Sequence, residues 1–340
     1  MSFAIWIGLA AVVLAGVLQG LFAVPMKYAR RWNYEHIWLT YSLAGMVVLP
    51  WFLTAATVPQ ATQVYSLTPT GVLIRIAGFG LCWGIGSALA GLGMRLLGIG
   101  LGMAIILGLA ASVGSLIPLL ILTPQQLHTS QGHTYLVGTV IMLAGIAVCA
   151  RAGMMRDATR ARGESPNRQS FLAGFIVCCL SGLFSSALNF AYAFGGEVVD
   201  RARSLGASTM WSSDAVTALA VFGGFIANLI YCGYLLRKNG SFSKFIGEGA
   251  ATGWLCGALM GLFWFGGQSL YAVGITWMGA LGVVIGWPLL MGMIIVTSNT
   301  AGLLTGEWDD VSSATKRLLA LGMLIVLVAL GVLAIAQRSA

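Results

Sequence analysis

The chain has 340 residues, of which 58% are hydrophobic and only 8% are charged, and its formal net charge is +8. Soluble domains carry about 25% charged residues, so this composition excludes a soluble globular enzyme, a disordered chain and a secreted disulfide scaffold. The composition is that of a polytopic membrane protein. Its basic residues lie in short loops, and no basic domain is present that could bind nucleic acid.

Ten apolar segments are long enough to cross a membrane as helices, which takes about 20 residues each. In chain order they are residues 4–24, 36–58, 71–94, 98–122, 134–152, 170–195, 209–236, 249–272, 277–303 and 317–336. The N-terminus lacks the basic region of a signal peptide, so the first segment is interpreted as a span. The most polar connection, residues 151–169, follows the fifth span and divides the chain nearly in half.

This division predicts an all-α integral membrane protein built from two five-helix repeats. We assign the first repeat to residues 1–152, a cytoplasmic linker to residues 153–169 and the second repeat to residues 170–340. With an odd number of spans in each half, the second half enters the membrane inverted relative to the first, as in many secondary transporters. A very short turn joins the third and fourth helices of each half, at residues 96–100 and 273–276, which is consistent with a duplication.

The distribution of basic residues predicts the orientation. Fourteen of the 18 Lys and Arg residues fall in the loops after the first, third, fifth, seventh and ninth helices. Short basic loops remain on the cytoplasmic side of a membrane. The sequence therefore places these loops in the cytoplasm and both termini on the periplasmic side.

Asp214 is the one acidic residue expected clearly within a span, about a turn and a half inside the outer end of the seventh helix. Ionisable groups inside a membrane are costly and are functional candidates by default. A carboxyl group at this depth could exchange a proton with the outside medium, so Asp214 is the candidate for proton coupling. The alternative is that the helix starts late and that Asp214 lies in its cap region with Ser212 and Ser213.

Neutral polar residues form stripes on three predicted helices. Each stripe lies on one helix face: Ser181, Ser185, Asn189 and Tyr192 on the sixth helix, Asp214, Thr217 and Asn228 on the seventh, and Trp264, Gln268 and Tyr271 on the eighth. Gln19 lies in the first helix. Such residues either join helices by hydrogen bonds or line a polar cavity, and three stripes in one half favour a shared cavity.

Three tryptophans, Trp83, Trp264 and Trp287, lie near the middle of predicted spans. A tryptophan at this depth either fills space or stacks on the apolar face of a sugar whose hydroxyls bond to amides and hydroxyls nearby. Pro288 follows Trp287 and is expected to break the ninth helix near the midplane, the alternative being a static kink.

The sequence lacks the motifs of membrane enzymes and ATP-driven pumps. It contains no HExxH, GxSxG or Walker A motif, and its three histidines lie at predicted helix ends or in loops. The six cysteines lie in apolar runs without metal-ligand spacing and are interpreted as small buried residues. We therefore expect no cofactor, no metal and no enzymatic activity, and transport would be driven by a gradient.

Several motifs resemble the L-rhamnose–proton symporter family. The segments that carry the resemblance are Phe22–Lys27 and Arg31–Trp38 in the first loop, Leu49–Trp51, and Gly80–Gly86 with Gly93–Gly98 in the third span. Less specific similarity extends through Val113–Pro118, Ala150–Gly153, Asn228–Leu229 and Leu304–Trp308, and so covers nearly the whole chain. This sequence has Ser87 where the family often has Asn, at a position where a change could alter the substrate.

The family belongs to the drug/metabolite transporter superfamily, and the resemblance implies proton-coupled sugar uptake across a bacterial inner membrane by ten helices in two inverted repeats. The leading hypothesis is an importer of L-rhamnose or a related deoxyhexose that works by alternating access, with protons, the sugar and membrane lipid as its partners. The candidate substrate-binding residues are Gln19, Trp83, Ser87, Asn189, Trp264, Gln268, Tyr271 and Trp287, and Asp214 is the proton carrier. The alternatives are an exporter or exchanger of another small metabolite on the same fold, or a membrane protein that does not transport. The sequence indicates no oligomeric state.

Overall fold

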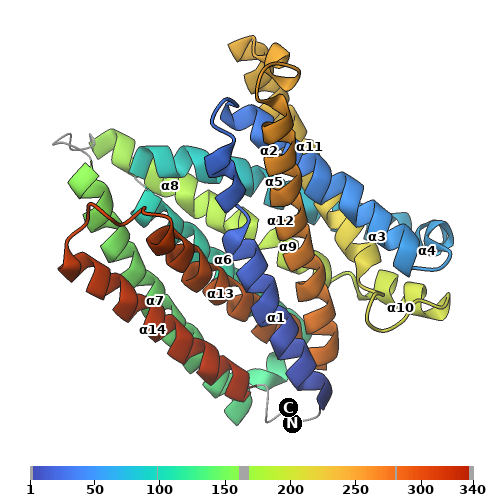
Figure 1. Ribbon diagram of the computed structural model, residues 1–340. Coiled ribbons are helices and arrows are strands. Elements are labelled where there is room, and N and C mark those ends of the chain that lie inside the picture. Colours follow the sequence, from blue (N-terminus) through green and yellow to red (C-terminus); the bar gives the residue numbers. More distant parts are fainter. Residues whose placement is uncertain (1–2, 98, 161–167, 280–281, 337–340) are drawn as a thin grey trace.

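The computed structural model of the chain is a bundle of membrane-length helices (Figure 1). It describes residues 3–97, 99–160, 168–279 and 282–336, and no β-strand occurs among them. Ten helical segments of this described part are long and apolar enough to cross a membrane: Phe3–Tyr28, Tyr34–Thr57, Thr70–Met94, Gly100–Leu122, Ser130–Thr159, Phe171–Ser204, Asp214–Asn239, Ala250–Met278, Gly282–Leu304 and Ser313–Ala336. The predicted all-α membrane fold and its ten spans are therefore confirmed.

Seven of these spans are single helices. They are α5 (Thr70–Leu97), α6 (Ile99–Leu122), α7 (Ser130–Arg160), α11 (Asp214–Asn239), α12 (Ala250–Met278), α13 (Gly282–Leu304) and α14 (Ser313–Ala336). The first span is α1 (Phe3–Leu21) with a 3-10 turn at Val24–Tyr28. Helices joined end to end form two others: α2 (Tyr34–Leu43), a π-helical turn (Ala44–Val48) and α3 (Leu49–Thr57), and α8 (Arg168–Ser185), α9 (Ala187–Ala193) and α10 (Gly196–Ser204). The short helix α4 (Ala61–Leu67) joins α3 to α5.

Helical structure enters the predicted linker from both sides. Helix α7 continues through residues 153–160, and α8 begins at Arg168. Residues 161–167, the remainder of the predicted linker, lie outside the described residues. The first half therefore ends in a helix that is longer than the apolar run from which it was predicted.

Two local predictions about helix geometry are wrong. Helix α11 begins at Asp214 with Ser213 at its N-cap, so this residue lies in the first helical turn rather than a turn and a half inside the span, and the alternative of a late helix start is the one confirmed. Pro288 does not break α13, because the helix is continuous from Gly282 to Leu304 with the proline inside it. Membrane helices tolerate proline inside a span; the carbonyl that Pro288 leaves without its helical donor is that of Val284, and the Asn189 side chain bonds to the neighbouring carbonyl of Val283.

The helices pair across the two halves of the chain. Helix α1 packs against α12 and α13, and α8 packs against α5 and α6. Helix α7 lies beside α14 along one side of the molecule (Figure 1). In span numbers, the first span packs against the eighth and ninth, and the sixth packs against the third and fourth. Exchanging the two halves of the chain, so that each span takes the place of its counterpart five spans away, converts one of these sets of pairs into the other. The fifth and tenth spans, α7 and α14, simply exchange places. The interior of the bundle is therefore formed by both halves together.

Glycines allow the closest of these contacts. A Cβ atom on Gly80 of α5 would collide with the carbonyl of Ala220 on α11, and one on Gly223 of α11 would collide with the carbonyl of Ala77 on α5. In lipid, helices associate by such close packing because the surrounding acyl chains remove the usual hydrophobic drive. The side chains that face away from the bundle are apolar, and they include Phe52, Ile74, Val140 and Ile230. These outward faces suit contact with membrane lipid.

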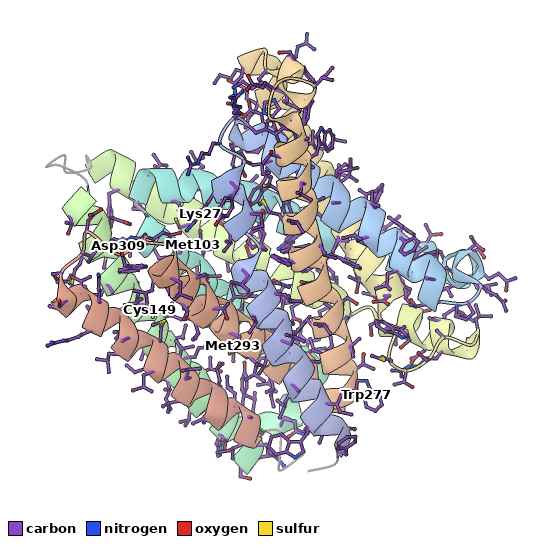
Figure 2. All side chains as sticks on the ribbon, in the orientation of Figure 1. Lys27, Met103, Cys149, Trp277, Met293 and Asp309 are labelled. Carbon is purple, nitrogen blue, oxygen red and sulfur yellow. The ribbon has the colours of Figure 1, made fainter. Side chains whose placement is uncertain are left out.

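The five loops predicted to be basic lie at one end of the bundle, which we call the basic end. Lys27 forms an ion pair with Glu307, Arg31 with Glu248, and Arg156 with Glu307. The backbone N–H of Gly100 donates to Asp157. Together these contacts connect the loops after the first, third, fifth, seventh and ninth spans. Figure 2 shows Lys27 and Asp309 toward this end and Trp277 toward the opposite end, near which the chain begins.

Candidate functional site

A chain of hydrogen bonds crosses the middle of the bundle. Gln19 of α1 donates to Gln268 of α12 at 2.9 Å, and Gln268 donates to the hydroxyl of Tyr192 on α9 at 3.0 Å. Tyr192 in turn donates to Thr217 of α11 at 3.1 Å, and Thr217 donates to the carbonyl of Ser213. All four side chains are buried. The chain links helices of both halves through groups that could equally bond to sugar hydroxyls.

Asn189 forms a second polar centre beside this chain. Its amide donates to the carbonyls of Gly114 on α6 and Val283 on α13, and its side-chain oxygen accepts a hydrogen bond from Tyr271. The ring of Tyr271 packs edge to face on that of Tyr192, with centroids 5.5 Å apart. The two polar centres are therefore contiguous.

The three tryptophans predicted near mid-span lie beside these polar centres, although Trp287 lies in the second turn of α13, which begins at Gly282. Trp83 and Trp264 stack with their centroids 5.1 Å apart and their planes 22° apart. Trp264 lies one helical turn before Gln268 on α12. Trp287 packs on Tyr271 at 5.6 Å and donates through Nε1 to the carbonyl of Ala110. In this conformation the aromatic faces cover one another.

Asp214 is buried at the outer edge of the same region, with only 2% of its surface exposed. Its carboxyl oxygens accept hydrogen bonds from Thr57 at 3.2 Å and from Ser269 at 3.4 Å. No cationic side chain among the described residues lies within ion-pair distance of it. A buried carboxyl group surrounded by hydroxyls, without a cation, is most easily accommodated in the protonated form.

Tyr65, on α4 outside the spans, closes the outer side of this site. It donates to the carbonyl of Ala215 at 3.0 Å. Burial raises the pKa of Tyr65, and the Asp214 carboxyl adds to the shift. Its hydroxyl therefore keeps its proton and continues to donate this bond at physiological pH.

The structure brings together most, but not all, of the residues predicted from the sequence. Gln19, Asn189, Gln268, Tyr271, Trp83, Trp264 and Trp287 form one contiguous group, which we call the central cluster. Asp214 is joined to it through Ser269, the neighbour of Gln268. Ser87 lies one turn from Trp83 on α5 but makes no side-chain hydrogen bond with the described residues. The prediction did not include Tyr192 and Thr217 among the binding residues, although both belong to its polar stripes.

A cavity of about 190 Å³ opens at the basic end instead of in the central cluster. Its walls come from α6, α7, α13 and the loop that follows α13. Its apolar lining includes Met103, Leu107, Ile146 and Ile295. Its polar lining includes Ser298, Asn299, Arg156 and Glu307.

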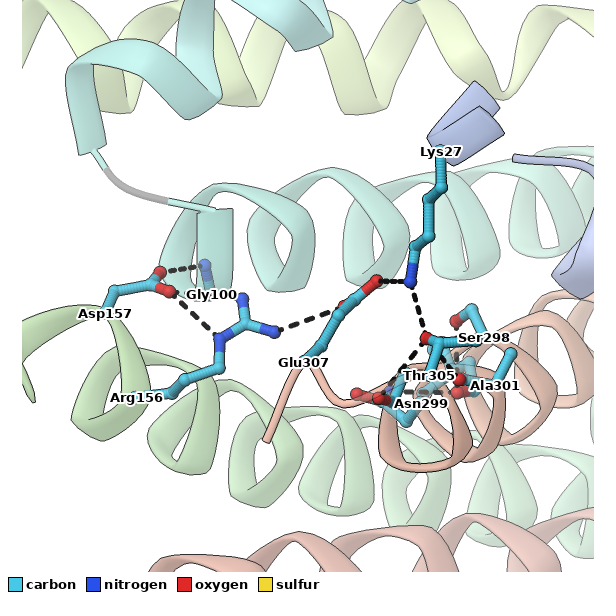
Figure 3. Close-up of polar contacts among 11 residues, drawn as sticks. Lys27, Gly100, Arg156, Asp157, Ser298, Asn299, Ala301, Thr305 and Glu307 are labelled. Carbon is cyan, nitrogen blue, oxygen red and sulfur yellow. Dashed lines mark hydrogen bonds and ion pairs between the residues drawn. The ribbon is translucent and has the colours of Figure 1, made fainter. Parts of the chain in front are cut away.

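Charged residues on the cavity wall form a network that joins four segments of the chain (Figure 3). Arg156 lies between Asp157, at 3.1 Å, and Glu307, at 3.7 Å, and its guanidinium stacks over Trp308 at 4.7 Å. Glu307 also pairs with Lys27, and Asp157 accepts a bond from the N–H of Gly100 at 2.8 Å. In the sequence, Arg156 counts only among the basic residues that predict the orientation, and only its place near the end of an apolar run pointed to a further role.

These features define a polytopic membrane protein with polar groups buried in its interior, the class that includes the secondary transporters. The chain belongs to the L-rhamnose–proton symporter family, since the family model described as L-rhamnose-proton symport protein matches residues 1–339. Proteins named L-rhamnose-proton symporter from Klebsiella pneumoniae, Shigella boydii and Salmonella typhi are 25%, 27% and 26% identical to it. Each alignment covers 100% of this chain and 100% of the relative.

Proposed function

We propose that the protein is a proton-coupled secondary transporter that imports L-rhamnose. The family match and the names of the full-length relatives support the substrate and the coupling ion. The central cluster supplies the amides, hydroxyls and aromatic faces that a sugar requires. The observation that carries the proposal within the structure is Asp214, a buried carboxyl that contacts hydroxyls and is connected to that cluster on two sides.

The first connection runs along α12. Ser269 donates to Asp214, and its neighbour Gln268 bonds to Gln19 and Tyr192. A change in the protonation of Asp214 alters its bond to Ser269 and so biases the position of α12. This is a physical route by which the proton affects the residues that bind the sugar.

The second connection runs along α11. Thr217 accepts from Tyr192 and donates to the carbonyl of Ser213, the residue before Asp214. Ser213 also bonds to Thr276 of α12 at 2.9 Å. Because both connections end on the cluster, proton binding and sugar binding are expected to favour the same conformation.

We assign the sugar to the central cluster in the conformation that opens it. Gln19, Asn189, Gln268 and Tyr271 would bond to hydroxyls, and Trp83, Trp264 or Trp287 would cover the apolar face of the ring. Ser87, beside Trp83 on α5, would contribute to the same pocket. The hydrogen bonds that these residues now make with one another would be exchanged for bonds to the sugar, at little net cost in free energy.

The transport cycle that we propose is alternating access between two inverted repeats, residues 1–152 and 170–340. The corresponding helix pairings of the two halves support this arrangement. We also propose that the protein lies in a bacterial inner membrane with its basic end in the cytoplasm and its termini in the periplasm, because basic loops remain inside. Protons would then load Asp214 from the periplasm.

Uptake of labelled L-rhamnose into proteoliposomes tests this function. An inward proton gradient is expected to drive accumulation, and collapse of the gradient by a protonophore is expected to abolish it. Rhamnose uptake that ignores the gradient would overturn symport. Absence of rhamnose transport, together with exchange of another metabolite, would favour the alternative function on the same fold.

A further inference from the structure

We propose that the cavity at the basic end is a second binding site for a neutral sugar, located between the central cluster and the aqueous phase. This inference rests on the proposed function. It assigns Asn299 and Ser298 as sugar-binding residues and Arg156 with Glu307 as a charged wall of the same site. None of these four residues belongs to the central cluster.

The size and the lining of the cavity fit such a ligand. One water molecule needs about 10–15 Å³ of such space, so 190 Å³ has room for about 13 to 19 groups of that size, enough for a six-carbon sugar. Met103, Leu107, Ile146 and Ile295 would contact the methyl group and C–H face of a deoxyhexose. Ser298, Asn299, Arg156 and Glu307 line the same cavity and would bond to its hydroxyls.

Ser298 and Asn299 have hydrogen-bonding capacity that no other described residue uses. The amide nitrogen of Asn299 donates to the carbonyl of Ile295 at 2.8 Å, and the hydroxyl of Ser298 donates to the same carbonyl at 3.3 Å. The Asn299 side-chain oxygen has no donor among the described residues. Two acceptors, the Asn299 oxygen and the Ser298 hydroxyl oxygen, are thus available side by side for the hydroxyl protons of a sugar.

The charges on the wall favour a neutral ligand over an ion. Lys27 and Arg156 are balanced by Asp157 and Glu307, each of which is paired. An anion would have to displace Glu307 from Arg156, and a cation would have to displace Lys27. A sugar hydroxyl can bond to either member of an ion pair without separating the charges.

The cavity also lies on a line with the central cluster. On α6, Leu107 of the cavity is one turn from Ala110, whose carbonyl accepts the bond from Trp287. On α13, Ile295 is eight residues, or about 12 Å, from Trp287. A Cβ atom on Gly114 would collide with the Trp287 ring, so this indole fills the space between α6 and α13. Trp287 therefore forms the part of the central cluster that lies toward the cavity along α6.

The mouth of the cavity faces the aqueous phase at the basic end. The side chains of Lys27 and Glu307 are 38% and 40% exposed, whereas that of Arg156 is only 10% exposed. The charged wall thus runs from solvent into the bundle. A sugar that has passed Trp287 would be held at Asn299 before it leaves.

Protection of an introduced thiol tests this site. Met103→Cys, in a chain whose six native cysteines are replaced, places a reactive group on the cavity wall. L-rhamnose is expected to slow alkylation of this thiol severalfold. Adding Asn299→Leu should raise the rhamnose concentration needed for protection by at least about tenfold. Thr300→Val is the matched control, because Thr300 is exposed on the next position of α13 and should leave protection unchanged.

A second pair of variants covers the case in which the introduced cysteine prevents folding. Ala104→Phe fills the cavity, whereas Ala88→Phe places the same ring in an apolar groove between α5 and α11. Saturating binding of tritiated rhamnose should fall from both sites to the central cluster alone in the first variant, and should stay unchanged in the second.

Each outcome separates the two proposals. Wild-type protein that binds rhamnose, combined with unprotected thiol or with unchanged binding in Ala104→Phe, would overturn the second site and leave the proposed function standing. If Asn299→Leu leaves the protection unchanged, the protection comes from rhamnose bound in the central cluster. That result would also overturn the second site. Wild-type protein that binds no rhamnose would overturn the proposed function itself.

Discussion

The side-chain amide of Asn189 lies 2.8 Å from the carbonyl oxygen of Gly114, four residues before Pro118. In a regular helix that carbonyl would accept a bond from the N–H of residue 118, which proline lacks. Asn189 thus supplies the donor that the proline removes, from a helix of the other half of the chain. The contact stabilises α6 and fixes α9 against it at the same point.

We expect Asn189→Leu to destabilise the protein by about 2–3 kcal/mol, because it leaves the buried Gly114 carbonyl and the Tyr271 hydroxyl without partners. The free energy of unfolding in mixed detergent micelles measures this loss. Pro118→Ala should restore an N–H donor within α6, so Asn189→Leu should cost about 1 kcal/mol less in that background. Strict additivity of the two substitutions would contradict the role assigned to this bond.

Gln268 is expected to decide the affinity for sugar. Gln268→Leu removes the middle of the hydrogen-bond chain and places an apolar group beside Trp264, so the Kd for L-rhamnose should rise about tenfold to a hundredfold. Equilibrium binding to purified protein provides the measurement. The same substitution at Gln125, which is exposed at the outer end, should leave the Kd unchanged. Equal changes in Kd at the two positions would mean that Gln268 does not belong to the binding site.

Asp214→Asn is expected to uncouple transport from the proton gradient. An inward gradient of one pH unit corresponds to about tenfold accumulation for one proton per sugar, and the variant should instead equilibrate the sugar without accumulating it. Counterflow, which needs no gradient, should persist and so report that the protein is folded. The control is Asp200→Asn, a carboxyl exposed on the same side of the molecule. Full accumulation by Asp214→Asn would mean that another group carries the coupled proton.

The orientation of the chain is testable by labelling. Single cysteines introduced as Ser204→Cys and Lys238→Cys, in the cysteine-free chain, lie exposed at opposite ends of the bundle. In intact cells, a membrane-impermeant maleimide should react at position 204, and at position 238 only after permeabilisation. The reverse pattern would place the basic end outside and would make the proposed direction of proton loading wrong.

The sequence predicted the features that depend on local composition. The ten spans follow from apolar length, and the grouping of the basic loops at one end follows from the alternation of spans. The polar stripe on the sixth span also identified Asn189 and Tyr192, because helical spacing alone places them on one face.

Features that depend on contacts between distant helices were not predictable in this way. Asp214 begins its helix because residues 209–213 form turns; the sequence offered this late start only as an alternative, through Ser212 and Ser213, because the length of the apolar run alone does not show the boundary. Pro288 was expected to break α13, but the helix continues through it, and whether a proline interrupts a helix depends on how the helix packs in the bundle. The cavity at the basic end was missed because it is assembled from α6, α7 and α13, none of which shows a distinctive motif.

The charged network beside Arg156 has an electrical consequence. It contains two cations and two anions in contact, so a rigid displacement of the four groups carries no net charge through the field of an energised membrane. Transmembrane voltage performs work only where unbalanced charge moves, at about 2.3 kcal/mol per elementary charge for 100 mV. Motion of this network is therefore expected to be indifferent to voltage, and a voltage sensitivity of transport is expected to arise at unbalanced charges, Asp214 among them.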